Sequence, residues 1–120
     1  MQAQVVTRQS FEPMVEAKEE TSQKRNLRQM TKVFKALSDG TRQQILQLLE
    51  ERQRNVGEIV SNFELSQPTI SRHLSVLKEA DLVIDQRQGQ NVVYRLNDAT
   101  LSSSMMQFFG RFSSCQSALR

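Results

Sequence analysis

A short polar segment, residues 67–75, carries the side chains whose types and spacing are suited to recognition chemistry. Its sequence is QPTISRHLS, and it contains no carboxylate. At about 100° per residue in a helix, Ile70 and Leu74 fall on one side, and Arg72 and Ser75 fall on the other. A guanidinium pairs with the edge of guanine, and a hydroxyl pairs with several bases. The pattern therefore favours insertion into a nucleic-acid groove over an ordinary solvated surface.

A second group of candidate side chains lies between two β-rich runs. Residues 82–87 and 91–96 are predicted to be strands, and Gly89 stands between them in a hairpin turn. Arg87 and Arg95 flank this turn, which carries no carboxylate. Such a hairpin is suited to resting on phosphates or entering a minor groove. A surface hairpin without a partner is the alternative.

Helices must position both groups, and apolar periodicity predicts where these helices lie. The expected helices cover about residues 25–37, 40–51, 56–62, 67–80 and a segment from 98 onward. We expect Ile45, Leu48 and Leu49 to be buried by the second of them. Five helices and a two-stranded hairpin predict a mainly α-helical, winged helix-turn-helix fold.

Capping residues support these helix boundaries. Ser38 or Asp39 is expected to cap the second helix, because a short side-chain oxygen accepts a hydrogen bond from a first-turn N–H. Asn55 precedes Glu58 by three residues, which is the spacing of a capping box. Ser66 is expected to cap the fourth helix, and Asp98 the fifth. A turn of three or four residues then separates the third and fourth helices, as in a helix-turn-helix.

Length and composition limit the domain organisation. The chain has 120 residues, of which 38% are hydrophobic, so it has room for one domain. We predict an arm at residues 1–24, a folded domain at 25–110 and a polar, fraying tail at 111–120. The arm could be helical in its last residues or could wrap a partner. The sequence contains no signal-peptide pattern and no apolar run long enough to span a membrane.

Several classes of chemistry are excluded by the residue counts. The chain has one cysteine, Cys115, and one histidine, His73, so neither an intrachain disulfide nor a multi-cysteine zinc site is expected. We interpret His73 as a packed residue at the edge of the core. Cys115 is expected to be an idle thiol, with an intersubunit disulfide as the alternative. The sequence lacks a nucleophile elbow and a phosphate-binding glycine loop. No enzymatic activity and no cofactor are expected.

Two apolar stripes exceed what a small monomer readily buries. They lie on the first and fifth predicted helices, and they consist of Met30, Val33, Phe34 and Leu37 and of Leu101, Met105, Phe108, Phe109 and Phe112. We predict that they form a homodimer interface. Two alternatives remain open: the stripes close a single core, or the fifth helix docks a different protein partner.

The whole pattern resembles the ArsR/SmtB-type transcriptional repressors. The similar stretches are FKALSDGTRQQILQLL at 34–49, LSQPTISRHLSVLKEADLV at 65–83 and RQGQNVVYRL at 87–96. The resemblance covers about residues 25–110. It implies a bacterial, cytoplasmic, nucleoid-associated homodimer that represses transcription from a pseudo-palindromic operator in double-stranded DNA. It names neither the operator nor the inducing signal.

The resemblance and the residue patterns together define candidate sites. The expected DNA contacts are Ser66, Gln67, Pro68, Thr69, Ser71, Arg72, Ser75, Arg87, Gln88, Gln90 and Arg95. The expected dimer contacts are Met30, Val33, Phe34, Leu101, Met105, Phe108, Phe109 and Phe112. Metal sensors of this family carry a Cys-x-Cys in the third helix or Asp and His ligands on the fifth. Residues 55–59 read NVGEI, and the fifth helix offers only Asp98. No metal site is therefore expected.

Overall fold

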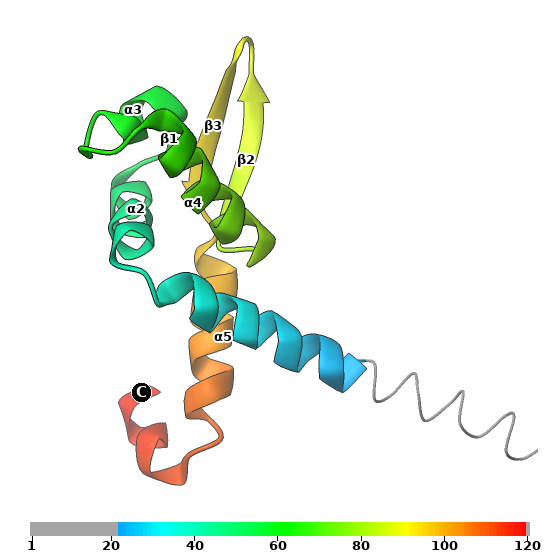
Figure 1. Cartoon of the computed structure of the whole chain (residues 1–120). Coiled ribbons are helices and arrows are strands. Elements are labelled where there is room, and N and C mark those ends of the chain that lie inside the picture. Colours follow the sequence, from blue (N-terminus) through cyan, green and yellow to red (C-terminus); the bar gives the residue numbers. More distant parts are fainter. Residues whose placement is uncertain (1–21, 120) are drawn as a thin grey trace, which may run out of the picture.

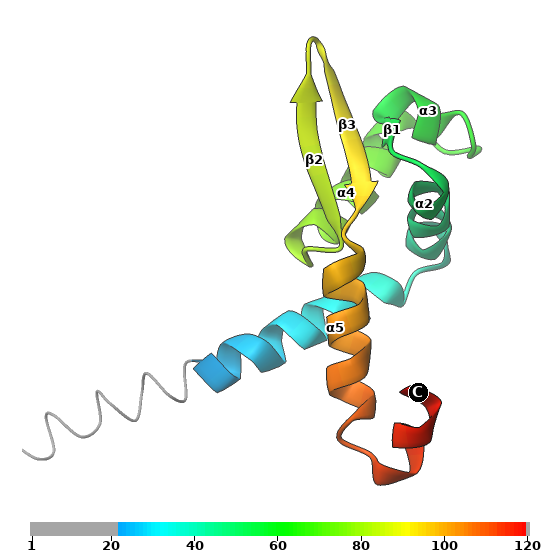
Figure 2. The same cartoon turned by 180° about the vertical axis from the view of Figure 1, so that it is seen from behind.

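The computed structural model describes residues 22–119 (Figures 1 and 2). A first helix covers residues 22–37. It is followed by α2 (Gly40–Glu51), β1 (Arg54–Asn55), α3 (Val56–Val60), α4 (Gln67–Glu79), β2 (Val83–Gln88), β3 (Asn91–Leu96), α5 (Asp98–Phe109) and a short 3-10 helix, η1 (Ser113–Leu119). The predicted order of helices and hairpin is confirmed. Most of the predicted arm lies outside the described residues, and residues 22–24 belong to the first helix.

The helix starts follow the local sequence. The Asp39 carboxylate accepts a hydrogen bond from the Arg42 backbone N–H at 3.0 Å and caps α2. Asn55 and Glu58 form the predicted capping box, with bonds of 2.8 and 2.9 Å. Ser66 caps α4 as expected. The prediction for α5 is wrong by one residue, because the Asn97 side chain makes this cap, and the helix begins at Asp98.

The core lies where α2, α3 and α4 meet the base of the sheet. Its fully buried side chains include Val33, Ile45, Ile59, Ile70, Leu74, Leu77, Leu82 and Val83. For α2, burial of Ile45, Leu48 and Leu49 was predicted. Ile45 and Leu49 are buried, but Leu46 takes the third buried position and Leu48 is only half-buried. Burial of each large aliphatic side chain stabilises the fold by about 1.5–3 kcal/mol.

The sheet has three antiparallel strands in the order β1-β3-β2. Arg54 pairs with Tyr94 and Asn55 with Val93, which adds a short strand that the two-stranded prediction missed. At the other end of the hairpin, Gly89 has a φ of 64°. A glycine adopts this left-handed conformation without a steric penalty, as the hairpin turn requires.

The first helix crosses α5 at the end of the molecule opposite the hairpin, as both views show (Figures 1 and 2). Phe34 contacts Phe108 edge-on, with the ring centroids 4.8 Å apart. Phe108 in turn contacts Phe112 at 5.2 Å. Residues 113–119, which were predicted to be a polar tail, form η1 beyond α5. Within residues 22–119, no helix combines the length and the apolar character that a membrane span requires.

Candidate nucleic-acid interface

Helix α4 is anchored through one side and leaves the other side exposed. Ile70, Leu74 and Leu77 are at most 1% exposed, which confirms the side that was predicted to face the core. The opposite side contains Arg72 and Ser75, and both are exposed. Because one face is fixed in the core, the rotation of α4 is fixed and the polar side must face away from the core.

The start of α4 combines a cap with an exposed polar tip. Ser66, Gln67 and Pro68 are exposed, whereas Thr69 and Ser71 are half-buried. The hydroxyl groups of Ser66 and Thr69 lie 2.9 Å apart, so Thr69 belongs to the cap as well as to the surface. The first turn contains no acidic residue. The partial positive charge of the helix start is therefore not neutralised, and it favours a phosphate nearby.

The two arginines that flank the hairpin turn in the sequence, Arg87 and Arg95, lie on different faces of the hairpin. Arg87, Gln88, Gln90 and Arg95 are all exposed. Arg87 pairs with Val92, whereas Arg95 pairs with Ile84, three positions from Arg87 along β2. Since side chains alternate along a strand and paired residues share a face, Arg87 and Arg95 project from opposite faces of the hairpin.

The face that carries Arg87 is the one that packs against α4. It also carries Asp85, two positions away, and Lys78 of α4 donates to the Asp85 carboxylate at 2.9 Å. This hydrogen bond is the main reason that the pKa of Lys78 is raised above its ordinary value. Arg87 therefore shares a side of the protein with α4, and Arg95 does not.

A network that the sequence did not predict holds α4 against the first helix. The Arg42 side chain donates from Nε to the Ala36 carbonyl at 2.8 Å and from Nη2 to the Lys35 carbonyl at 3.2 Å. Its Nη1 lies 3.3 Å from Nδ1 of His73, which stands on α4. His73 is half-buried, and its Nδ1 is 3.9 Å from the Asp39 carboxylate. The geometry supports the interpretation of His73 as a packed residue.

A positively charged hollow of about 470 Å³ adjoins this network. Lys32, Lys35 and Arg42 line it together with Val76 and Glu79 of α4. The two α4 residues follow Arg72 by one and two helical turns, so the hollow continues the exposed Arg72 side. No sequence motif indicates this hollow, because its basic residues come from two separate segments, the first helix and α2.

No metal centre is formed by the part of the chain that is described. Within residues 22–119, no three His, Cys, Asp or Glu side chains are grouped closely enough to bind an ion. Cys115 is a free, half-buried thiol in η1.

The predicted dimer residues divide into two groups. Val33 is 0% exposed and belongs to the core of the single chain, so it has no surface to offer a second copy, and its assignment was wrong. Met30 is also buried, whereas Phe112 is 45% exposed. The half-buried members are Phe34, Leu101, Met105, Phe108 and Phe109. Met106 and Leu27, which were not predicted, are 55% and 51% exposed.

Known proteins resemble this chain in sequence and in fold. The family model "Bacterial regulatory protein, arsR family" matches residues 39–85. The transcriptional repressor SdpR of Bacillus subtilis is 45% identical over 76 residues, which are 63% of this chain and 84% of SdpR. The chain belongs to the ArsR family. ArsR1 of Pseudomonas putida, an arsenic resistance transcriptional regulator, is 48% identical over 66 residues, or 54% of this chain and 52% of ArsR1.

A solved relative supports the fold assignment. The homodimeric winged helix-turn-helix DNA-binding domain Mb0332 from Mycobacterium bovis has a TM-score of 0.59 and 33% sequence identity. The match covers 71% of this chain and 81% of that domain. The predicted winged helix-turn-helix fold and the resemblance to ArsR/SmtB-type repressors are confirmed. The ArsR-family relatives are transcriptional regulators and not enzymes.

Proposed function

We propose that this ArsR-family protein is a homodimeric repressor that binds a pseudo-palindromic operator through α4 of each subunit. The observation that carries the proposal is the outward side of α4, which is exposed, polar and free of carboxylates from Gln67 to Lys78. Short polar side chains let a helix enter the major groove deeply.

Individual roles follow from side-chain chemistry. Arg72 is suited to a bidentate contact with guanine, Gln67 to adenine, and Ser71 and Ser75 to either base type. Arg87 is the hairpin residue that we expect beside DNA bound by α4, because the two lie on the same side of the protein. The start of α4 and the basic hollow would anchor phosphates, which adds affinity without sequence preference.

The dimer is proposed to form through α5 and the first helix. Leu27, Met106 and Phe112 are large apolar side chains that remain exposed in the single chain. The homodimeric state of the Mycobacterium bovis relative supports this arrangement. A two-fold axis there would place the two α4 helices about 34–36 Å apart, which matches successive turns of the major groove.

We further propose that repression does not depend on a metal ion and that the protein acts in the bacterial cytoplasm. The segment around Asn55–Ile59 contains no thiol, and α5 contains no imidazole. These are the ligands that hold soft and borderline ions. We propose Cys115 to be an idle thiol, because it lies beyond α5, away from α4.

The test is fluorescence anisotropy with DNA from upstream of the gene, over a range of salt concentrations. Arg72→Ala should lower specific affinity by about ten-fold or more, because a bidentate base contact contributes about 1–3 kcal/mol. Arg111→Ala removes the same charge at an exposed position after α5 and should bind like the parent. Light scattering should show both variants to be dimers. If Arg72→Ala binds specific DNA as tightly as the parent does, the assignment of α4 is wrong.

The alternative is a protein-interaction module that docks through the apolar face of α5, and it rests on the exposure of Met106 and Phe112. Absence of any DNA shift, together with a stable complex in pull-down that a Phe112→Ser variant loses, would favour this alternative over the repressor.

A further inference from the structure

The first helix carries positive charge and no negative charge. Residues 22–37 contain five basic side chains and no carboxylate. At about 100° per residue, four of these basic side chains fall within an arc of about 80°. We call this group the basic stripe, and it consists of Arg25, Arg28, Lys32 and Lys35. All four are exposed, and none of them forms an ion pair with a residue between 22 and 119.

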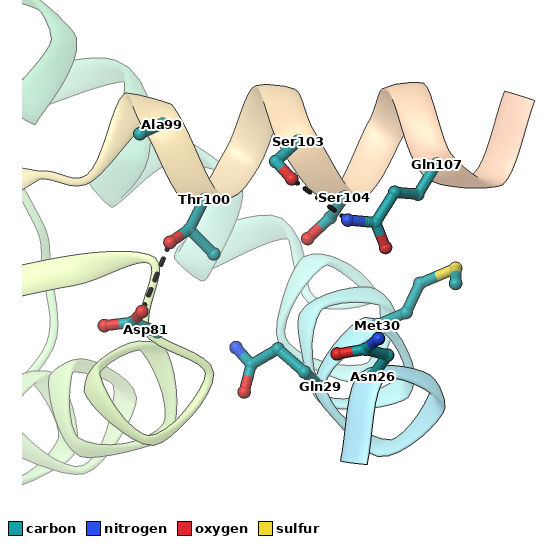
Figure 3. Close-up of a pocket in the computed structure, with 9 residues that line it drawn as sticks. All are labelled: Asn26, Gln29, Met30, Asp81, Ala99, Thr100, Ser103, Ser104 and Gln107. Atoms are coloured by element: carbon teal, nitrogen blue, oxygen red, sulfur yellow. Dashed lines mark hydrogen bonds between the residues drawn. The ribbon is translucent and has the colours of Figure 1, made fainter. Parts of the chain in front are cut away.

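The basic stripe lies on the side of the first helix that faces away from α5. On the opposite side, Asn26, Gln29 and Met30 line a hollow of about 330 Å³ beside Ser104 of α5 (Figure 3). Val33 is on this side as well, and it is 0% exposed. The helix is therefore held in the protein through one side. The other side, with the stripe, faces solvent, and no acidic side chain of the helix neutralises its charge.

The basic stripe is continuous with the outward side of α4. Lys32 and Lys35, at one end of the stripe, line the basic hollow together with Val76 and Glu79 of α4. With Arg42, the hollow contains three cationic side chains and one carboxylate, so its charge has the same sign as that of the stripe. The first helix and α4 also share a side of the molecule. Both lie in front of α5 and the hairpin in Figure 1, and both lie behind them in Figure 2.

The length of the basic stripe fits a run of DNA phosphates. From Arg25 to Lys35 the stripe spans about 15 Å along the helix axis. One strand of a duplex presents a phosphate about every 3.4 Å of axis, so the stripe can face about four phosphates. Cations in a row suit a continuous polyanion better than one small anion. An anionic membrane fits less well, because an interfacial helix inserts an apolar side, and the apolar side of this helix contacts α5 and the core.

We propose that the basic stripe binds the DNA backbone between the two half-sites of the operator. This inference rests on the repressor function proposed above. Because the first helix and α5 form the interface of the proposed dimer, the two stripes lie near the two-fold axis, between the two α4 helices. DNA that reaches from one α4 to the other passes this region. Contacts with phosphates there add affinity for any sequence and no preference among sequences.

The contribution to affinity is tested by fluorescence anisotropy at different salt concentrations. The full chain is titrated with upstream DNA and with a scrambled duplex of the same length. Arg28→Gln or Lys32→Gln removes two phosphate contacts per dimer, so the salt slope should decrease by about 1.8 with either duplex. The affinity deficit of each variant should thus shrink by about 12-fold from about 50 to 200 mM salt. Arg111→Gln removes the same charge from an exposed position after α5 and should keep the parent slope.

Ethylation interference locates the phosphates that are contacted. Ethylation removes the charge of a phosphate, and duplexes modified at single positions are separated into bound and free fractions. For the parent, ethylation should interfere at phosphates within each half-site and at phosphates midway between the half-sites. The midway interference should be weaker for Arg28→Gln and Lys32→Gln and unchanged for Arg111→Gln. The ratio of specific to non-specific affinity should also stay at the parent value in both stripe variants, because phosphate contacts do not read bases.

The proposal is overturned if both stripe variants keep the parent salt slope, or if no phosphate between the half-sites interferes. Sedimentation with vesicles of phosphatidylserine and phosphatidylcholine examines the other polyanion. Vesicle binding that both stripe variants lose, with unchanged DNA slopes, would assign the stripe to a membrane instead.

The outcome for the stripe is separable from the outcome for α4. If Arg72→Ala loses specific affinity while the stripe variants keep the parent slope, only the inference about the stripe fails. If Arg72→Ala binds like the parent while the stripe variants have reduced slopes on the scrambled duplex, base reading by α4 fails and the stripe remains a surface for the DNA backbone.

Discussion

Replacement of Arg42 by alanine tests whether one side chain joins the end of the first helix to α4. The last carbonyl groups of a helix have no partner within the helix. In the first helix, the Ala36 carbonyl is satisfied by Arg42, and the Leu37 carbonyl by the Gln43 side chain at 2.7 Å. Arg42→Ala leaves the cap of α2 intact, because that cap uses the backbone N–H of residue 42.

The magnitude follows from the three contacts that are lost. Ala36 is 0% exposed, and a buried carbonyl without a partner costs about 1–3 kcal/mol. The hydrogen bond to the Lys35 carbonyl is exposed, so its loss changes the free energy of unfolding little. Loss of the contact with His73 lowers it by about a few tenths of a kcal/mol. We therefore expect Arg42→Ala to lower the free energy of unfolding by about 2 kcal/mol, which is about 30-fold in the unfolding equilibrium. With an m-value of about 2 kcal/mol/M, the urea midpoint should fall by about 1 M.

The assay is urea unfolding followed by circular dichroism at equal protomer concentration, since dimerisation couples stability to concentration. Lys32→Ala is the matched control. It removes the same charge from an exposed position that lines the same basic hollow as Arg42, between the first helix and α4. That control should change stability by less than about 0.5 kcal/mol. If Arg42→Ala lowers stability no more than Lys32→Ala does, the bridging role of the guanidinium is refuted. Arg42→Lys should fall between the two, because one ammonium cannot serve all three acceptors.

Two further predictions concern the hairpin turn and acid stability. Gly89→Ala should lower stability by about 1 kcal/mol in the same urea assay, because a Cβ meets no atom there but the positive φ is strained for alanine; an unchanged midpoint would argue against this turn geometry. The Arg42 backbone N–H is the main cause that lowers the pKa of Asp39 below its ordinary value of 3.8. The unfolded chain therefore takes up this proton first, so the stabilisation is present above the ordinary pKa and is lost as pH falls through the folded value. Urea midpoints measured across the acid range should fall less steeply for Asp39→Asn than for the parent, and equal slopes would exclude Asp39 as a contributor.

Features that depend on neighbouring residues were predictable from the sequence. The caps at Asp39, Asn55 and Ser66 each act on a backbone N–H three residues later, so spacing alone identifies them. The core side of α4 follows from helical periodicity, and the outward side is then determined as its complement. Gly89 was predictable because a two-residue hairpin loop favours glycine.

Features that depend on contacts between distant segments were not predictable. Strand β1 has only two residues, and its pairing with Tyr94 spans a large part of the chain. Val33 shares an apolar periodicity with Phe34, but periodicity cannot say whether a side chain faces its own core or a second copy. The opposite projection of Arg87 and Arg95 depends on the strand register, which the sequence of each strand alone does not fix.

The same distinction applies to the surface features of the protein. The proposed DNA-reading surface belongs to one helix, so a single stretch of sequence contains both the buried residues that orient it and the exposed polar residues. The hollow beside Ser104 is assembled from the first helix, the turn after α4 and α5, and each contributes ordinary polar residues without a recognisable motif. Sites grafted on a shared fold can change chemistry without changing the fold. Membership of the ArsR family therefore supports the proposed DNA surface on α4, whereas it says nothing about a hollow built from residues of several segments.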